Sequence, residues 1–121
     1  MARYRGLTLR ILCGDFPAIG PGKAELIDLI GQTGSISAAA RAMGMSYRRA
    51  WQLVESLNNT FREPVVVTAI GGNRGGGTQV TPYGKRLVAL FRTMEKKASA
   101  AIEADLRRFK GNLCKARKKR R

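Results

Sequence analysis

Between residues 21 and 58 the apolar side chains recur at intervals of three and four, which is the period of helices that bury one face. A first helix is predicted over about 21–32. The stretch Ser35–Asn58 then predicts two short helices, because Gly44 suits the left-handed conformation that ends one helix and Ser46 suits the N-cap of the next. A tight bend between two packed helices follows.

The third predicted helix, about 46–58, has two different faces. Its inward positions are apolar: Ala50, Leu53, Val54 and Leu57. Its opposite, leading face carries Tyr47, Arg48, Arg49 and Gln52. Arginine side chains match guanine or phosphate and glutamine can pair with adenine, so this face is typical of a helix that enters the DNA major groove. An ordinary helical hairpin with a solvated basic face is the alternative interpretation.

The pattern changes from helical to alternating before and after this region. Residues 7–12 alternate well enough for a short strand, and 14–22 is a turn-rich connection. Beyond the third helix, a β-branched run at 65–70 and a second strand at 78–81 flank the glycine-rich segment 71–77. Three helices followed by a β-hairpin is the element order of a winged helix-turn-helix. We therefore predict a mainly α fold with a small β-hairpin wing.

The glycine-rich segment 71–77 lies at the tip of this predicted wing. Glycines let a backbone lie close to a sugar-phosphate chain, and Asn73 and Arg74 can reach phosphate or the minor groove. A nucleotide-binding P-loop is not expected, because it requires Gly-Lys-Ser/Thr at the start of a helix, whereas Thr78 begins a predicted strand. A flexible hairpin loop without a ligand is the remaining alternative.

From Pro82 onward the chain predicts one long helix, since Thr81 can cap it and no helix breaker follows before Gly111. Such a helix of roughly 28 residues is about 42 Å long, and a domain of this size does not cover its whole length with its own surface. Its apolar stripe consists of Leu87, Leu90, Phe91, Met94, Ala98, Ala101, Ile102, Leu106 and Phe109. We expect this stripe to pack on a second copy of the chain as a dimerisation helix, with a solvated monomeric extension as the alternative.

Composition narrows the classes of ligand. The chain has 121 residues with 23 Lys and Arg, 8 Asp and Glu, and a formal charge of +15, which favours nucleic acid first and acidic membranes second. No apolar run is long enough to span a membrane, so a cytoplasmic protein is expected. Histidine is absent and Cys13 lies far from Cys114, so no metal site, cofactor or enzyme activity is expected. We expect Cys13 near the core.

The positive charge is concentrated at the C-terminus, where residues 107–121 include nine basic and no acidic side chains. We expect a winged helix-turn-helix with its dimerisation helix over 1–106, followed by a disordered basic tail over 107–121. Such a tail would hold phosphate without reading base sequence. A tail that only increases solubility is the alternative.

Several of these motifs occur together in one known family. Gly34-Ser-Ile-Ser37, Gly44-Met-Ser-Tyr-Arg-Arg-Ala-Trp51, the segment Gly71–Gly77 and Thr-Pro-Tyr-Gly84 before a long helix resemble the N-terminal DNA-binding domain of the molybdate-responsive ModE family. The opening Gly-Ser-Ile-Ser-Ala-Ala-Ala is also more distantly similar to LysR-type winged helices. The resemblance extends from about Leu7 to Leu106.

The resemblance implies a bacterial, dimeric transcription regulator that binds double-stranded DNA, with Trp51 in the core. The DNA-binding residues expected on this basis are Ser37, Ser46, Tyr47, Arg48, Arg49, Gln52, Asn73 and Arg74. Members of the family carry a C-terminal oxyanion-sensing module, whereas a basic segment follows the predicted dimerisation helix here, so molybdate or tungstate binding is not expected within this chain. A non-specific nucleoid or RNA-binding protein is the main alternative, and a basic membrane-surface helix is a weaker one.

Overall fold

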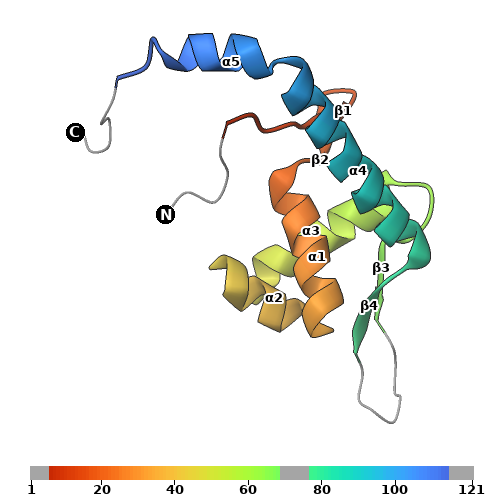
Figure 1. Cartoon of the computed structure of the whole chain (residues 1–121). Helices are drawn as coiled ribbons and strands as arrows, with labels where there is room; N and C mark the ends of the chain where they lie inside the picture. Colours follow the sequence, from red (N-terminus) through yellow and green to blue (C-terminus); the bar gives the residue numbers. More distant parts are fainter. Residues whose placement is uncertain (1–5, 69–76, 115–121) are drawn as a thin grey trace.

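The computed structural model describes residues 6–68 and 77–114, and it has the predicted class of fold (Figure 1). Three helices follow one another: α1 (Pro21–Thr33), α2 (Ile36–Met43) and α3 (Tyr47–Thr60). Two short antiparallel hairpins and two further helices complete the described residues. The prediction of a mainly α fold with a small β-hairpin wing is confirmed.

The helix boundaries follow the predicted capping residues. Gly34 and Gly44 both adopt the left-handed conformation, with φ of 70° and 72°, where a side chain would be strained. The Ser35 hydroxyl accepts the Ala38 N–H at 3.0 Å, and the Ser46 hydroxyl accepts the Arg49 N–H at 3.0 Å. These local interactions set the sharp turn that presents the start of α3.

The core lies where α1, α2 and α3 meet the hairpin of β3 (Val66–Thr68) and β4 (Thr78–Val80). Small side chains at Ala39, Ala40 and Ala50 are buried, which lets α2 and α3 pack closely. The largest fully buried side chains are Leu26, Ile27, Ile30, Leu57 and Val65. The predicted inward face of α3 is thus confirmed.

The wing stem consists of β3 (Val66–Thr68) and β4 (Thr78–Val80), which pair antiparallel with Val66 opposite Val80. The Asn58 side chain joins this stem to α3, because its oxygen accepts the N–H groups of Val65 at 2.7 Å and Val66 at 3.1 Å. Its amide donates to the Val66 carbonyl at 2.9 Å. The predicted wing tip, with Asn73 and Arg74, lies outside the described residues.

The N-terminal region differs from the sequence prediction. The strand expected over 7–12 is β1 (Ile11–Cys13), and a second strand, β2 (Phe16–Ile19), occupies part of the segment expected to be a connection. Gly14, with φ of 66°, makes the tight turn between them. Cys13 is exposed on this hairpin, so its expected position near the core is wrong.

The predicted single long helix is also wrong, because it is divided into α4 (Pro82–Ala101) and α5 (Glu103–Lys110), which point in different directions (Figure 1). Ile102 leaves the helical conformation, with φ of −109° and ψ of 13°. Glu103 and Asp105 lie in the first turn of α5, where negative charge stabilises a helix N-terminus. These charges favour a new helix start at a position without glycine or proline.

The helix α4 begins as predicted, with the Thr81 hydroxyl accepting the Gly84 N–H at 2.9 Å and Pro82 in the first turn. It packs against α1, and Phe91 enters the core. The helix α5 spans both sides of the boundary expected at residue 106. The division into a domain of 1–106 and a tail of 107–121 stays a prediction.

Candidate nucleic-acid interface

The leading surface of α3 exposes polar and aromatic side chains together. A shallow hollow of about 350 Å³ is lined by Tyr47, Arg48, Trp51 and Gln52. On the opposite side of the same helix Ala50, Val54 and Leu57 are buried. The helix is therefore fixed to the core by one side while the other side is free to contact a ligand.

Trp51 belongs to this exposed surface, so its predicted place in the core is wrong. Its side chain is 44% exposed, although the neighbouring Ala50 is fully buried. One residue along a helix is a rotation of about 100°, which carries Trp51 away from the buried stripe. Its spacing of four residues from Tyr47 was the signal in the sequence, because such pairs lie on the same helix surface.

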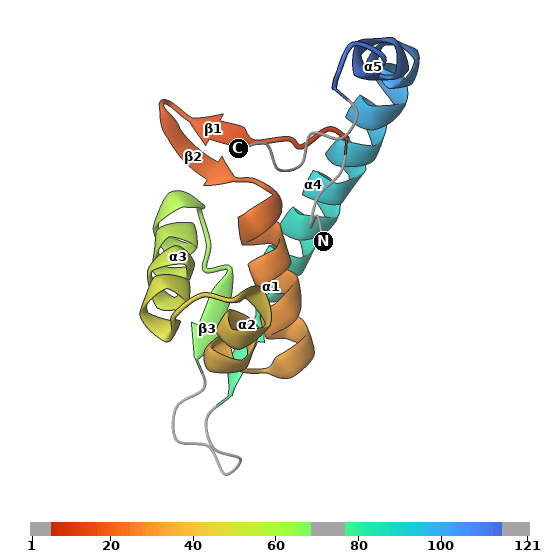
Figure 2. The same cartoon turned by 90° about the vertical axis from the view of Figure 1, so that its left-hand side faces the viewer.

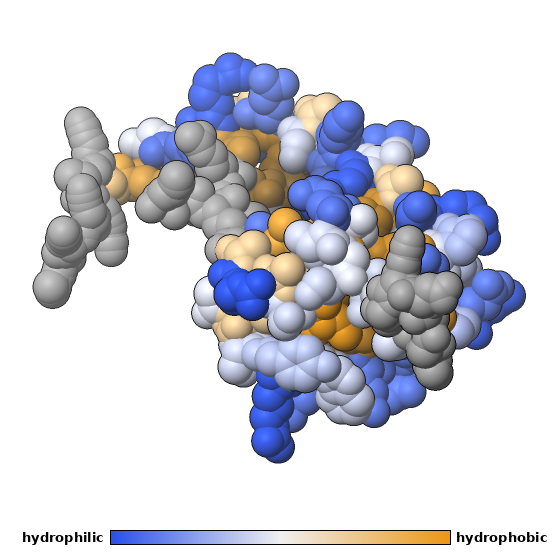
Figure 3. All heavy atoms as spheres, turned by 90° about the horizontal axis from the view of Figure 1, so that it is seen from below, coloured by the Kyte–Doolittle hydropathy of each residue, from blue (hydrophilic) through white to orange (hydrophobic). Residues whose placement is uncertain are grey.

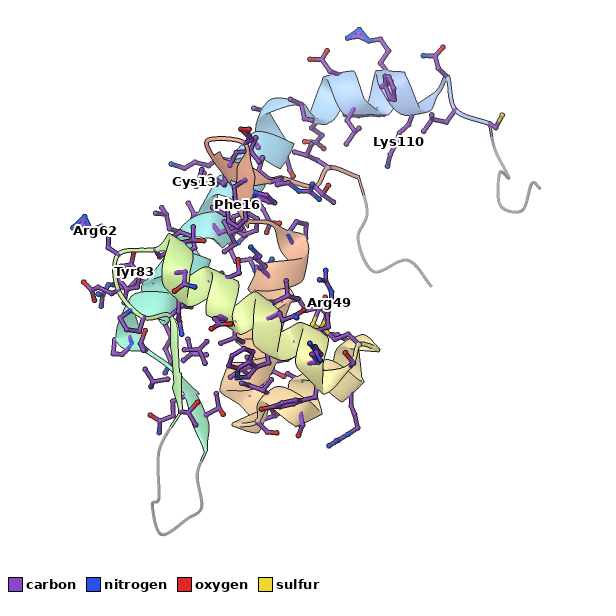
Figure 4. The ribbon with its side chains drawn as sticks, turned by 180° about the vertical axis from the view of Figure 1, so that it is seen from behind. Cys13, Phe16, Arg49, Arg62, Tyr83 and Lys110 are labelled. Atoms are coloured by element: carbon purple, nitrogen blue, oxygen red, sulfur yellow. The ribbon has the colours of Figure 1, made fainter. Side chains whose placement is uncertain are left out.

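The two adjacent arginines point to different sides of α3. Arg48 lines the hollow beside Tyr47 and Trp51, whereas Arg49 lines a separate groove between α3, the start of α1 and the β1–β2 hairpin. Figure 4 shows Arg49 near the N-terminal end of α3. Only Arg48 therefore shares a surface with Gln52, and the predicted set of four leading side chains is divided between two surfaces.

The two serines expected at the interface both lie at the start of a helix: Ser46 is the N-cap of α3, and Ser37 follows the N-cap of α2. Ser46 accepts the Arg49 N–H, and its hydroxyl proton stays free to be donated to another acceptor. Ser37 lies in the first turn of α2 and is partly buried, with its hydroxyl oxygen 3.3 Å from that of Ser35. Both serines are thus close to helix N-termini, which attract anions.

Two cationic side chains, Lys23 from α1 and Arg49 from α3, line one groove beside α3. Burial, followed by the charge of Arg49, lowers the pKa of Lys23 at the start of α1. Seen from the end that carries α2 and the wing stem, the surface has hydrophilic side chains at its edge and apolar ones between them (Figure 3).

Two properties of the described residues bear on metal binding and on membrane insertion. Among residues 6–68 and 77–114, no cluster of three or more His, Cys, Asp or Glu side chains could hold a metal ion. Within the same ranges, each helix is too short or too polar to cross a membrane.

The fold and the exposed surface of α3 define a winged helix-turn-helix. No protein-family model matches the sequence. The chain is 40% identical over 86 residues to the molybdenum transport protein ModE of Azotobacter vinelandii, covering 71% of this chain and 32% of that protein. It is 47% identical over 77 residues to the molybdenum-pterin-binding protein MopB of Rhodobacter capsulatus, covering 64% and 28% of the two chains.

A third relative is the DNA-binding transcriptional dual regulator ModE of Escherichia coli, which is 38% identical over 71 residues, or 59% of this chain and 27% of the regulator. The resemblance to ModE-type regulators, first found in the motifs, is confirmed by these similarities. The chain spans about a third of the length of the relatives it matches.

Proposed function

We propose that this protein is a regulator of transcription that binds double-stranded DNA in a sequence-specific manner. The observation that carries the proposal is the exposed surface at the start of α3, where Arg48 and Gln52 lie beside two aromatic side chains. A helix of this kind, preceded by a capped turn and followed by a wing, fits the major groove. The similarity to the DNA-binding transcriptional dual regulator ModE of Escherichia coli supports the same function.

In this proposal α3 occupies the major groove and its side chains have separate tasks. Arg48 pairs with a guanine edge and Gln52 with an adenine edge, while Tyr47 contacts the sugar-phosphate backbone. Arg49, on the flank of α3, contacts phosphate. Ser37 and Ser46 donate hydroxyl protons to phosphate near the starts of α2 and α3. Asn73 and Arg74 would extend the contact from the wing.

We also propose that the protein acts as a homodimer through α4. Leu90 is 58% exposed and Met94 is 37% exposed, one helical turn apart on the same side of α4. Exposed apolar pairs of this kind are covered when two copies associate. A dimer would place two α3 helices for successive major grooves.

The test of DNA recognition begins with selection of bound sequences from a random DNA pool. Affinity for the selected site is then measured by fluorescence anisotropy over a salt series. Arg48→Ala and Gln52→Ala should each weaken binding to the selected site by roughly 10- to 100-fold. Arg86→Ala, which removes the same charge from an exposed position of α4, is the matched control and should have little effect.

The same experiment distinguishes sequence-specific recognition of DNA from the alternative, a non-specific nucleoid or RNA-binding protein. The total charge of +15 favours that alternative, since charge alone gives tight binding at low salt. A selection that enriches no sequence, or an Arg48→Ala variant that retains full site preference, would refute recognition through α3.

The dimer is tested separately by sedimentation velocity. Leu90→Gln combined with Met94→Gln should shift the chain toward the monomer at micromolar concentration. Leu113→Gln changes a comparably exposed leucine beyond α5 and should leave the dimer intact. A wild-type chain that stays monomeric throughout this range would contradict the proposal.

A further inference from the structure

A second concave surface lies beside α3, on the side away from Trp51. It is a groove of about 440 Å³ between the β1–β2 hairpin, the start of α1 and α3. Figure 2 shows that the hairpin and α3 project on the same side of the molecule. Pockets that bind small molecules typically have volumes of about 300–1,000 Å³, so this groove is large enough for an organic ligand.

The walls of the groove are mainly apolar. Met43 is the last residue of α2, Met45 lies in the turn before α3, Leu53 comes from α3, and Phe16 comes from β2. Methionine side chains are flexible and polarisable, which lets them adapt to ligands of different shape. An occupant would therefore bury an apolar body against these side chains.

Three cationic side chains line the same groove, each from a different segment: Arg10 before β1, Lys23 in α1 and Arg49 in α3. Among the described residues that line the groove, none is acidic. The Arg10 side chain lies close to Gly20, since a Cβ atom built on Gly20 would be 3.7 Å from its Cγ. The groove thus combines an apolar wall with positive charge that its own lining does not neutralise.

Lys23 is held in place within this groove. Its Nζ donates to the Pro17 carbonyl at 3.0 Å and to the Ser56 hydroxyl at 3.3 Å, and it lies 5.4 Å from the centre of the Phe16 ring. Burial and the positive charge of Arg49 both lower its pKa. A bound anion would offset these two unfavourable effects, because it supplies the opposite charge that the site lacks.

We propose that this groove binds a small organic anion, a carboxylate attached to an aromatic or branched apolar body, with the carboxylate between Lys23 and Arg49. A phosphate of the DNA backbone would satisfy the cations but would leave Met43, Met45 and Leu53 without a partner. The apolar wall therefore favours an amphipathic small molecule. Because Arg49 is part of α3, such a ligand would act as an effector, an interpretation that rests on the proposed DNA-binding function.

The binding test uses the full chain with ¹³C-labelled methionine methyl groups and contains no DNA, so its result is independent of the proposed function. The probes are 2-naphthoate, its neutral analogue 2-naphthamide, and inorganic phosphate. We expect 2-naphthoate to shift the methyl signals of Met43 and Met45 in a saturable, one-to-one manner. The methyl of Met94, on α4 and outside the groove, is the internal control and should not move.

The neutral amide should bind about tenfold more weakly, which is the effect of losing one charge-assisted hydrogen bond. Lys23→Met should weaken 2-naphthoate binding by a similar factor without changing binding of the amide. Arg49→Ala, at an exposed position, tests the carboxylate site without disturbing the core. Lys97→Met, on the exposed surface of α4, is the matched control and should leave both affinities unchanged.

Three outcomes would overturn the proposal. Equal affinity for the acid and the amide would leave only an apolar groove without an anion site. Saturable shifts of Met43 and Met45 with phosphate alone would assign the groove to simple anions or to the DNA backbone. Parallel movement of the Met94 signal would indicate non-specific association of the aromatic probe.

Discussion

Substitution of Gly84 by alanine tests how closely α4 packs on the wing stem. Gly84 is buried in the first turn of α4. A Cβ atom at this position would lie 2.5 Å from the Val65 carbonyl oxygen and 3.0 Å from a methyl group of each of Val65 and Val80. The first of these neighbours is backbone, so a side-chain rotation cannot relieve the overlap.

Two opposing effects decide how the Gly84→Ala substitution changes the free energy of unfolding. Alanine is favoured over glycine inside a helix by about 0.5–1 kcal/mol. Overpacking of a close-packed core costs about 1–3 kcal/mol, and the upper part of this range is expected because the displaced carbonyl also accepts the Thr81 N–H at 2.9 Å. The Gly84→Ala variant should therefore be less stable than the wild type by about 1–2 kcal/mol.

The measurement is urea unfolding followed by far-ultraviolet circular dichroism, with all proteins at one concentration because association would shift the apparent stability. Gly31→Ala is the matched control, since Gly31 is also helical and a Cβ there would meet a Val80 methyl at an ordinary 3.6 Å. This control should be more stable by about 0.5–1 kcal/mol. If both variants shift stability in the same direction, the close approach at Gly84 has no energetic role and the reasoning is refuted.

Three further changes test separate interactions. Asn58→Ala should destabilise the fold by about 2–3 kcal/mol, because the N–H groups of Val65 and Val66 lose their acceptor. Faster hydrogen exchange of the Val65 amide would reveal this loss. Ser46→Ala should cost about 1 kcal/mol in urea unfolding through loss of the α3 cap, and Ser46→Asp should recover most of it. The pKa of Lys23 should lie below the ordinary lysine value, and Arg49→Ala should raise it; an unchanged titration of the Lys23 side-chain signal would contradict the charge coupling.

The sign of the Lys23 effect on stability follows from linkage. Its folded-state pKa lies below the unfolded value, so the unfolded chain holds the proton more tightly. The penalty of keeping the ammonium partly buried is present at neutral pH, and it is relieved as pH rises through the lowered pKa. The contribution of this one side chain to stability should therefore increase with alkaline pH, and Lys23→Met should abolish it.

The local signals of the chain were enough for the helix-turn-helix and for the wing stem. Gly34 and Gly44 end helices because only glycine adopts their backbone conformation without strain, and Ser46 caps the next helix from its own side chain. The buried stripe of α3 likewise follows from helical spacing. These features depend on residues that are close in sequence, so they could be predicted without knowledge of the fold.

Features that depend on distant partners could not be predicted in this way. Residues 14–22 include turn-forming glycines and prolines, yet pairing with β1 makes part of this segment a strand. Arg48 and Arg49 are equivalent in the sequence pattern, but the hairpin that covers one side of α3 places Arg49 in a groove with Lys23. Local propensity is weaker than the packing of a neighbouring element, and that neighbour is set only when the chain is folded.

The surface of α3 likewise combines features that the local sequence determined with features that only the folded structure determined. The sequence alone indicated which side of the helix is apolar, because burial requires a continuous stripe of apolar positions. Helical spacing places Trp51 on the side of Tyr47, but only the tertiary structure decided that no element in the described residues covers this side and that the predicted long helix ends at Ile102. The type of a large apolar residue does not tell whether it lies inside or outside a core. Its burial depends on whether another element packs over it.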